Sequence, residues 1–330
     1  MKIKQQAIFP YVVADVGGTN ARFSLVTGQT DASNSLDLSH QQIYLCQDFI
    51  NFEDLLGGYI TSLGDVKPIG AAVAIAGPLL GNKIKMTNLT WEISIDAIQK
   101  QFKLEQFRCI NDFGALAYST LQLEQNDVQI IHQGIHNENA NRAIIGPGTG
   151  LGIAGLVRSG DHWMPVAGEG GHMTYAPASK IEMEIRKVIE PGDKHISAER
   201  FVSGPGLVNI YKALSLINGT PFEAISPSAI SQRAITKSDH ACEEALKLFC
   251  KMLGTVAGNA CLVYGAYGGV YLGGGILPKI QSEELLNYIA ERFQQKGRLQ
   301  GLLDKVPLYM LRGEFTALKG VAHWHYDNNS

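Results

Sequence analysis

Apolar and polar positions alternate in short runs through the first half of the chain, and this spacing predicts β-strands. Residues 11–15 and 21–26 form two such runs, and the glycine-containing segment 16–20 between them predicts a tight turn. Residues 71–76 predict a buried strand that stops at a Gly-Pro pair. Residues 107–110 predict another strand, which stops at Asn111 and Asp112 before a helical pattern over 115–121.

The second half of the chain opens with the same pattern. Residues 143–150 predict a strand that runs into a Gly-Pro-Gly-Thr-Gly turn, and residues 151–157 predict the returning strand. Helical spacing follows over 181–189, over 205–216 with Ser203 as the expected cap, and over 243–263. Strands mixed with helices in this way predict an α/β fold whose two halves begin alike.

Composition agrees with a globular chain of more than one domain. The chain has 330 residues, of which 45% are hydrophobic and 18% charged, which excludes fibrous and disordered classes. Single cores stop growing at about 250–300 residues, so two domains with a cleft between them are expected. With 28 basic and 31 acidic side chains the net charge is -3, and a nucleic-acid partner is not expected.

The cysteines and the apolar segments indicate a reduced, cytoplasmic protein. Five cysteines form no C-x-x-C pair, which fits buried thiols better than disulfides or a zinc site. Pro10 and Asp15 interrupt the apolar stretch near the start, so no signal peptide is expected. Asn259 and several glycines break the uncharged run 252–278, which predicts a buried helix and strand, and no membrane partner.

Two glycine-threonine turns are the first candidate sites. In residues 15–20 the backbone N–H groups and the Thr19 hydroxyl could hold a phosphate, and Asp15 could hold a metal-bound water; an ordinary hairpin is the alternative. The turn over 146–152 has the same two interpretations. Two such turns facing each other across a cleft favour phosphate binding.

Polar side chains outside the turns suit hydroxyl chemistry. Asp112 at the end of a strand could accept a proton from a hydroxyl that Asn111 holds, although an Asx cap on the next helix is equally consistent. Glu169 and His172, on a glycine-hinged loop, suit vicinal hydroxyls. Glu199 taken alone is more simply a first-turn helix acid.

Other nucleotide and metal motifs are excluded or weak. Gly150, Gly152 and Gly155 match the dinucleotide fingerprint in form only, because an extended segment rather than a helix follows them. No Walker A sequence occurs, and the Asp-Phe-Gly triplet at 112–114 lacks the other protein-kinase motifs. A helical H-E-x-x-H pair is absent, so zinc is not expected.

Together the motifs resemble one family, the bacterial glucokinases of the hexokinase/actin-like ATPase fold. In the family's order, the resemblance is carried by DVGGTNARF, MTNLTW, IND, GPGTGLG, EGGH, SAERFVSGPGLVN and VYLGGGI, and it runs from about Val12 to about His323. Met173 to Pro177 follow EGGH with no cysteine nearby, and in this the chain resembles the zinc-free glucokinase branch rather than the zinc-containing repressor/open-reading-frame/kinase group.

The resemblance implies ATP-dependent phosphorylation of the 6-hydroxyl of glucose, the first step of glycolysis. Asp112 would be the catalytic base, and ATP would carry most of the contacts to Mg²⁺, with Asp15 reaching the ion through water. The sugar-binding residues would be Asn111, Asp112, Glu169, His172 and Glu199. The ATP-binding residues would be Ala14, Asp15, Val16, Gly17, Gly18, Thr19, Gly148 and Thr149.

The same resemblance implies a two-lobed, ribonuclease H-like fold with a central cleft. The small domain would comprise residues 1–122 and 312–330, and the large domain residues 123–311, in a homodimer. A kinase for another hexose or an N-acetylhexosamine is the main alternative, because the phosphate turns do not select the sugar. A non-catalytic sugar sensor is less favoured, since Asp112 is present and no helix-turn-helix precedes the first strand.

Overall fold

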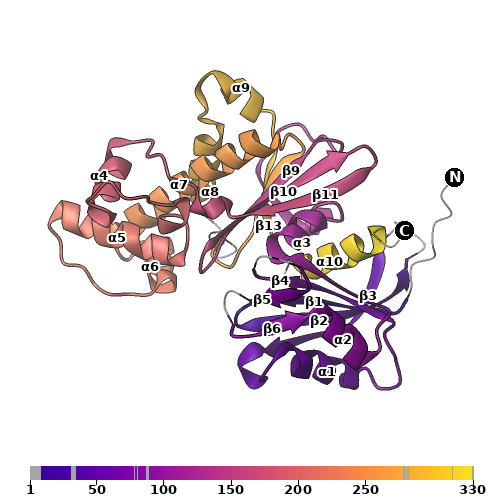
Figure 1. Cartoon of the computed structure of the whole chain (residues 1–330). Coiled ribbons are helices and arrows are strands. Elements are labelled where there is room, and N and C mark those ends of the chain that lie inside the picture. The colour runs from indigo at the N-terminus through magenta and orange to yellow at the C-terminus, as the bar shows by residue number, and fades with distance from the viewer. Residues whose placement is uncertain are drawn as a thin grey trace. The chain divides into compact units, whose positions relative to one another are not determined.

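A computed structural model describes residues 9–30, 35–77, 79, 81–86, 89–277, 280, 282–313 and 315–328. The chain forms two compact units, one made of Met1–Glu124 with Gly313–Ser330 and the other of Gln125–Arg312 (Figure 1). Each unit is built on its own sheet. The first eight residues, for which no signal peptide is expected, lie outside the described residues, as do Thr87 and Asn88 of the MTNLTW segment and Pro278 at the end of the uncharged run.

The sheet of the first unit has five strands in the order β3-β2-β1-β4-β7. Their bounds are β1 Tyr11–Val16, β2 Asn20–Gln29, β3 Leu36–Leu45, β4 Gly70–Ile75 and β7 Gln106–Asn111. β1, β4 and β7 are parallel, and the register aligns Val16 with Ile75 and Ile75 with Asn111. The segments that follow these three strands therefore leave the sheet at one edge. A small ladder of β5 Lys83–Lys85 and β6 Glu92–Ser94 completes the unit's strands.

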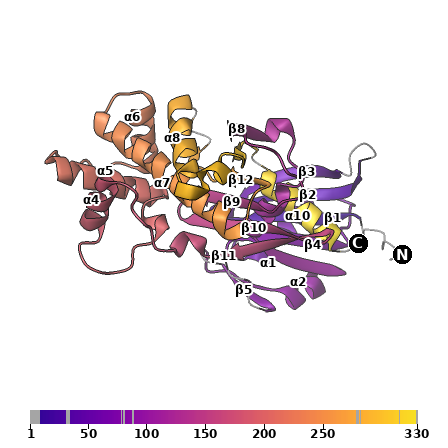
Figure 2. The ribbon, with the colours of Figure 1, turned by 90° about the horizontal axis from the view of Figure 1, so that it is seen from above.

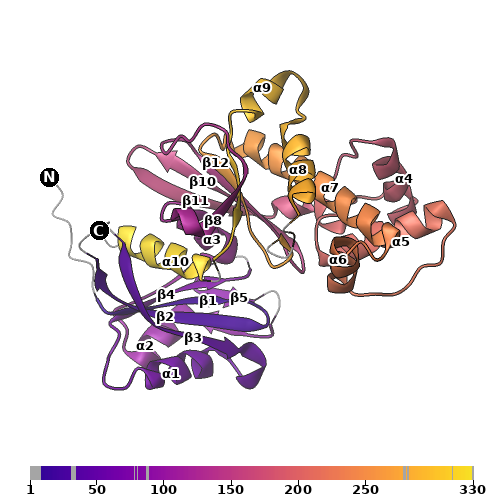
Figure 3. The ribbon, with the colours of Figure 1, turned by 180° about the vertical axis from the view of Figure 1, so that it is seen from behind.

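Helices cover both faces of this sheet because the buried strands are apolar on both sides. Val12 and Ala14 of β1 belong to the core under α1 Phe52–Ser62 and α2 Ile95–Phe102. Tyr11 and Val13 belong to the core under α3 Asp112–Ser119 and α10 Thr316–Asp327 (Figure 3). Alternate residues of a strand point to opposite faces, which accounts for the division.

α10, from the end of the chain, packs directly on α3. A Cβ added at Gly320 would lie 1.9 Å from the Ala115 carbonyl oxygen, so only glycine permits this approach. The Tyr118 hydroxyl donates to Asp327 at 2.5 Å on the same contact. The helix that begins with Asp112 is therefore fixed on two sides, by the sheet and by α10.

The second unit repeats the strand order of the first. Its six-stranded sheet runs β11-β10-β9-β12-β13-β8, and the first five strands correspond in order and direction to β3-β2-β1-β4-β7. The bounds are β8 Val128–His132, β9 Arg142–Pro147, β10 Leu151–Ser159, β11 His162–Gly168, β12 Gly269–Leu272 and β13 Leu308–Leu311. The prediction that the two halves begin alike is confirmed.

The remaining helices belong to the second unit. They are α4 Lys180–Ile189, α5 Gly204–Asn218, α6 Pro227–Ile235, α7 His240–Tyr264, α8 Glu283–Gln294 and α9 Gln300–Leu303. Short 3-10 turns lie at Cys46–Asp48 in the first unit and at Gln125–Asp127, Gly170–His172, Ala198–Arg200 and Gly297–Leu299 in the second. Figure 2 shows α4, α5 and α6 grouped with α7. The Ser203 hydroxyl accepts from the Gly206 N–H, which confirms the predicted cap.

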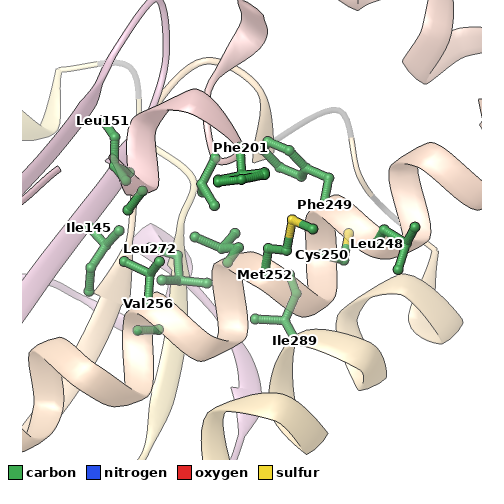
Figure 4. Packing of buried hydrophobic residues seen from close by; sticks show 14 of the residues in the cluster. Ile145, Leu151, Phe201, Leu248, Phe249, Cys250, Met252, Val256, Leu272 and Ile289 are labelled. Atoms are coloured by element: carbon green, nitrogen blue, oxygen red, sulfur yellow. The ribbon is translucent and has the colours of Figure 1, made fainter. Parts of the chain in front are cut away.

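α7 is the central core helix of the second unit. Among the described residues it alone is long and apolar enough to cross a membrane, yet most of that stretch is buried inside the protein. Val256 lies beside Ile145 of β9 and Leu272 of β12, and Phe249 lies beside Phe201, all in one buried core (Figure 4). The predicted buried helix followed by a buried strand is confirmed, since every residue of β12 is also buried.

The cysteines are all free, as expected. Four of them are buried, and Cys109 on β7 is partly buried. Three of the buried ones, at 242, 250 and 261, lie on α7. None is close to a partner for a disulfide, and they act as small apolar side chains of the two cores.

Candidate active site

The first glycine-threonine turn joins β1 to β2 in the first unit. The Gly17 N–H donates to the Asn20 carbonyl at 3.0 Å, which closes the turn. The Cys46 N–H, just after β3, donates to the Thr19 carbonyl at 2.8 Å and holds the turn from outside. The Thr19 side chain remains exposed at the tip. The predicted strand, turn and strand are thus confirmed, with a hydroxyl presented to solvent.

Asp15 lies one residue before the end of β1 and faces Arg22 across the hairpin. The carboxylate Oδ2 and guanidinium Nη1 are 3.8 Å apart. Burial raises the pKa of Asp15 above its usual range, and the charge of Arg22 opposes that rise. The sequence motifs alone do not indicate a role for Arg22. A hairpin drawn with its turn at residues 16–20 places Arg22 opposite Asp15, so the pair can be recognised from the strand register.

Asp112 begins α3 at the same sheet edge as the first turn. The side-chain oxygen Oδ1 of Asn111 caps the helix, accepting from the N–H groups of Phe113 at 3.0 Å and Gly114 at 3.2 Å. The capping interpretation of Asn111 is therefore correct, and the helix starts three residues earlier than predicted because of that cap. The Asn111 amide nitrogen donates to the Gly77 carbonyl at 3.4 Å.

The second glycine-threonine turn joins β9 to β10 in the second unit. The Gly148 N–H donates to the Gly150 carbonyl at 2.8 Å, and the Thr149 side chain is exposed, as Thr19 is in the first unit. The Gly204 N–H at the start of α5 donates to the Gly148 carbonyl at 2.8 Å. The turn is therefore fixed by a helix N-terminus rather than by a strand.

The glycine segment after β12 lies against the same turn. The Gly273 N–H donates to the Ile145 carbonyl at 2.8 Å. Gly274 has a φ of +89°, and a Cβ there would lie 2.3 Å from the Pro147 carbonyl oxygen. Close backbone approach and the positive φ therefore explain the glycine at position 274 of VYLGGGI.

The candidate sugar-binding groups of the second unit meet at the start of β10. Glu169 precedes a 3-10 turn over Gly170–His172 and His172 ends it, and both side chains are exposed. A Cβ at Gly171 would lie 2.0 Å from the Leu151 carbonyl oxygen, so this turn rests directly on the strand. Sequence spacing alone did not reveal that contact.

Glu199 contacts Leu151 from a different segment of the chain. It lies in a 3-10 turn over Ala198–Arg200, and its Oε2 accepts from the Leu151 N–H at 2.9 Å. A Cβ at Gly150 would lie 2.6 Å from that oxygen. The simple interpretation of Glu199 as a helix acid is therefore incomplete, because its carboxylate is bound to the second turn.

The two units divide the candidate residues between them. The first unit carries Ala14 to Thr19, Asn111 and Asp112, and the second carries Gly148, Thr149, Glu169, His172 and Glu199. Ala14 and Val16 have buried side chains and can offer a ligand only backbone groups. Within the described parts of the chain, no three His, Cys, Asp or Glu side chains come together in a way that could hold a metal.

The fold places the chain in a known class. A crystal structure of glucokinase from an Antarctic psychrotroph is similar with a TM-score of 0.90 and 35% identity, covering 97% of this chain and 99% of that one. A glucokinase of the repressor/open-reading-frame/kinase (ROK) family from Streptomyces griseus has the same fold, with a TM-score of 0.63 and 17% identity, covering 96% and 98% of the two chains. The protein has the α/β, two-lobed actin-like ATPase fold and is an ATP-dependent hexose kinase.

Comparison of sequences identifies the family. The glucokinase family model matches residues 12–328. The glucokinase of Saccharophagus degradans is 42% identical over 96% of this chain and 98% of its own length, and that of Chromobacterium violaceum is 37% identical over 95% and 88%. The chain belongs to the glucokinase family. The resemblance expected from the motifs is confirmed.

Proposed function

We propose that the chain transfers the terminal phosphoryl group of ATP to the 6-hydroxyl of glucose, with Asp112 as the base. The observation that supports this role is the register of the first unit's parallel strands. Val16, which precedes the first turn, and Asn111, which precedes Asp112, both align with Ile75 of β4, so they lie at the same end of the sheet. A phosphate-binding turn and a carboxylate are thus presented at one edge. The same geometry places reacting groups in other α/β enzymes, beyond the carboxyl ends of parallel strands.

Asp112 would orient the sugar hydroxyl before it takes the proton. Phosphoryl transfer passes through a loose transition state, so the proton leaves late and the carboxylate needs no unusual pKa. Capping by Asn111 fixes the first turn of α3, and packing of α10 fixes the rest of that helix. The catalytic oxygen is therefore held by rigid elements, which favours in-line attack.

The sugar hydroxyls would be bound by Asn111, Glu169, His172 and Glu199. Glu199 uses Oε2 for the Leu151 N–H, which leaves Oε1 for a sugar hydroxyl. Exposed Glu169 and His172 supply an acceptor and a group able to donate or accept. Contacts of this type select one sugar from another, because a sugar that lacks the matching hydroxyl leaves a polar group unpaired.

The ATP phosphates would be bound by the two turns, through Ala14 to Thr19 and through Gly148 and Thr149. Thr19 and Thr149 both present hydroxyls, and Gly148 has open space around it. When bound with ATP, Mg²⁺ neutralises the charge that develops on the transferring group. Asp15, whose carboxylate already faces a cationic group, Arg22, at 3.8 Å, would reach that ion through water.

We also propose that the protein works as a cytoplasmic homodimer. The support is the resemblance to the bacterial glucokinases, together with five free thiols, which suit a reducing compartment. Light scattering coupled to size-exclusion chromatography gives the mass directly. A mass of one chain at all concentrations would contradict the dimer.

The reaction is tested by a coupled assay of sugar-dependent ADP release with Mg-ATP. Glucose, mannose, fructose and N-acetylglucosamine are run in parallel, and the phosphorylated product is identified by its position of substitution. A strong preference for glucose with a 6-phosphate product is expected. A preference for N-acetylglucosamine or another hexose would instead support the alternative kinase on the same fold.

A further inference from the structure

A buried ion pair lies behind the sugar-side segment of the second unit. Glu182 of α4 is fully buried, and its Oε1 accepts from Arg292 Nη2 of α8 at 2.5 Å. Its other oxygen, Oε2, accepts from the Tyr175 hydroxyl at 2.9 Å and from the Ala178 N–H at 2.8 Å. Arg292 Nε donates further to the Thr255 hydroxyl of α7 at 3.3 Å. Both carboxylate oxygens of Glu182 are therefore satisfied.

Such a pair does not by itself account for stability. Removing two charges from water costs about as much as their attraction returns, and apolar replacements of the same size are often as stable. The geometry of the pair is specific, however, because the Glu182 carboxylate of α4 binds both α8 and the 175–178 segment, and Arg292 of α8 also binds α7. A network of this kind defines positions more than it adds free energy.

Tyr175 connects the network to a short ladder between two segments. Thr174 pairs antiparallel with Ser197, the Tyr175 N–H donates to the Ile196 carbonyl at 3.0 Å, and the Ala198 N–H donates to the Met173 carbonyl at 2.9 Å. The Tyr175 ring also packs on Phe201, with centroids 4.8 Å apart. Because Tyr175 belongs to both, the ladder links the hydrogen-bond network of Glu182 to the backbone positions of residues 173 and 198.

The two candidate sugar-binding groups stand directly outside this ladder. His172 precedes Met173 on one segment, and Glu199 follows Ala198 on the other. Glu199 is also bound to the Leu151 N–H, and the 3-10 turn that ends at His172 rests on the Leu151 carbonyl through Gly171. The separation of the two groups is thus set on one side by Leu151 and on the other by the ladder.

We propose that Tyr175, Glu182 and Arg292 are positioning residues that set the separation of His172 and Glu199 and thereby the affinity for the sugar. The inference rests on the sugar-binding roles proposed above. None of the three residues need touch the sugar; they act through the ladder. Burial, and then the carboxylate of Glu182, raise the pKa of Tyr175, so the hydroxyl keeps its proton and remains a donor.

Tyr175→Phe is the test, because it removes only the hydroxyl and leaves the ring on Phe201. The expected result is a rise of about tenfold in KM for glucose, with KM for ATP and kcat nearly unchanged, since a less fixed ladder weakens ground-state sugar contacts. Tyr211→Phe is the matched control. Tyr211 is equally buried, at 4% exposure, in the same unit, but lies on α5 away from the ladder.

Thermal unfolding of both variants separates positioning from plain stability. If Tyr175→Phe lowers the melting temperature but leaves KM for glucose unchanged, the three residues are structural only and the inference is wrong. Glu182→Gln gives a second test, since it replaces one of the two acceptor oxygens by an amide NH₂ and removes the charge beside Arg292. It too should raise KM for glucose selectively in the protein that remains folded, and an unchanged KM would again overturn the proposal.

Glu199→Gln distinguishes this inference from the function on which it rests. If Glu199→Gln raises KM for glucose and Tyr175→Phe does not, the sugar site stands and the positioning role fails. If neither Glu199→Gln nor His172→Asn affects KM for glucose, the proposed sugar site itself is wrong, and the positioning role fails with it.

Discussion

The carboxylate of Glu199 accepts a hydrogen bond from the backbone N–H of Leu151 at 2.9 Å. Leu151 is the residue on which Gly171 also rests, through its carbonyl oxygen. The backbone N–H and the carbonyl oxygen of Leu151 therefore contact both the Glu199 turn and the EGGH loop. These two segments are about thirty residues apart in the sequence. A candidate phosphate turn and the candidate sugar residues of the second unit share this one point of support.

Gly171→Ala should impair sugar binding for a steric reason. The added Cβ would lie 2.0 Å from the Leu151 carbonyl oxygen, so the backbone must move, and overpacking of this kind costs about 1–3 kcal/mol. KM for glucose should rise by about tenfold or more, a change readily measured by the coupled assay. Gly168→Ala is the control, since a Cβ there meets nothing within 4 Å. Equal KM values for the two variants would contradict the argument.

Asp112→Asn should separate binding from catalysis. The amide keeps the shape of the side chain and its place at the start of α3 but cannot accept the hydroxyl proton. Turnover should fall by about two to four orders of magnitude, the usual contribution of a general base, while the dissociation constant for glucose from calorimetry stays close to that of the parent protein. Comparable turnover would refute the assignment of the base.

Acid should destabilise the first unit through two histidines of α10. Burial, and then the charge of Lys319, lower the pKa of His323 to about 4; burial, and then Arg108, do the same for His325. Both folded values lie below the ordinary 6.5, so between pH 6.5 and 4 the unfolded chain binds protons that the folded chain does not. The stabilisation is complete above pH 6.5 and is lost as the pH falls toward 4.

Urea unfolding at several pH values measures this effect. His323→Gln should lose less stability between pH 7 and 5 than the parent protein, because one of the two titrating groups is removed. His136→Gln is the control, since His136 is exposed on a loop of the second unit. A pH dependence in His323→Gln equal to that of the parent would show that His323 does not contribute.

The cysteines should resist alkylation in the folded protein. Burial raises the pKa of Cys109 and of Cys250 to about 12, so almost no thiolate is present at pH 8. Mass spectrometry after iodoacetamide treatment should find the folded chain largely unmodified and the chain in urea modified at all five positions. Rapid modification of the folded chain at these sites would contradict the core packing described here.

Local patterns predicted most of the elements but none of the contacts between distant segments. The strands on either side of both turns were recognisable because alternation and paired glycines are local signals. The start of α3 was misplaced because Asn111 acts both as the last residue of β7 and as the cap. The bonds that join Glu199 to Leu151 and Tyr175 to Glu182 depend on the packing of several helices, which a single sequence does not specify.

The repeated strand order also has a consequence for how this enzyme could have arisen. β7 in the first unit and β13 in the second occupy equivalent places, but β7 leads into Asn111 and Asp112, whereas β13 ends at Leu311 and is followed by Arg312. Both halves retain the exposed threonine of the turn. An ancestral duplication would therefore have left two copies of the proposed phosphate-binding hairpin and one copy of the proposed base, so the two halves differ at the end of the fifth strand, where only the first carries the carboxylate.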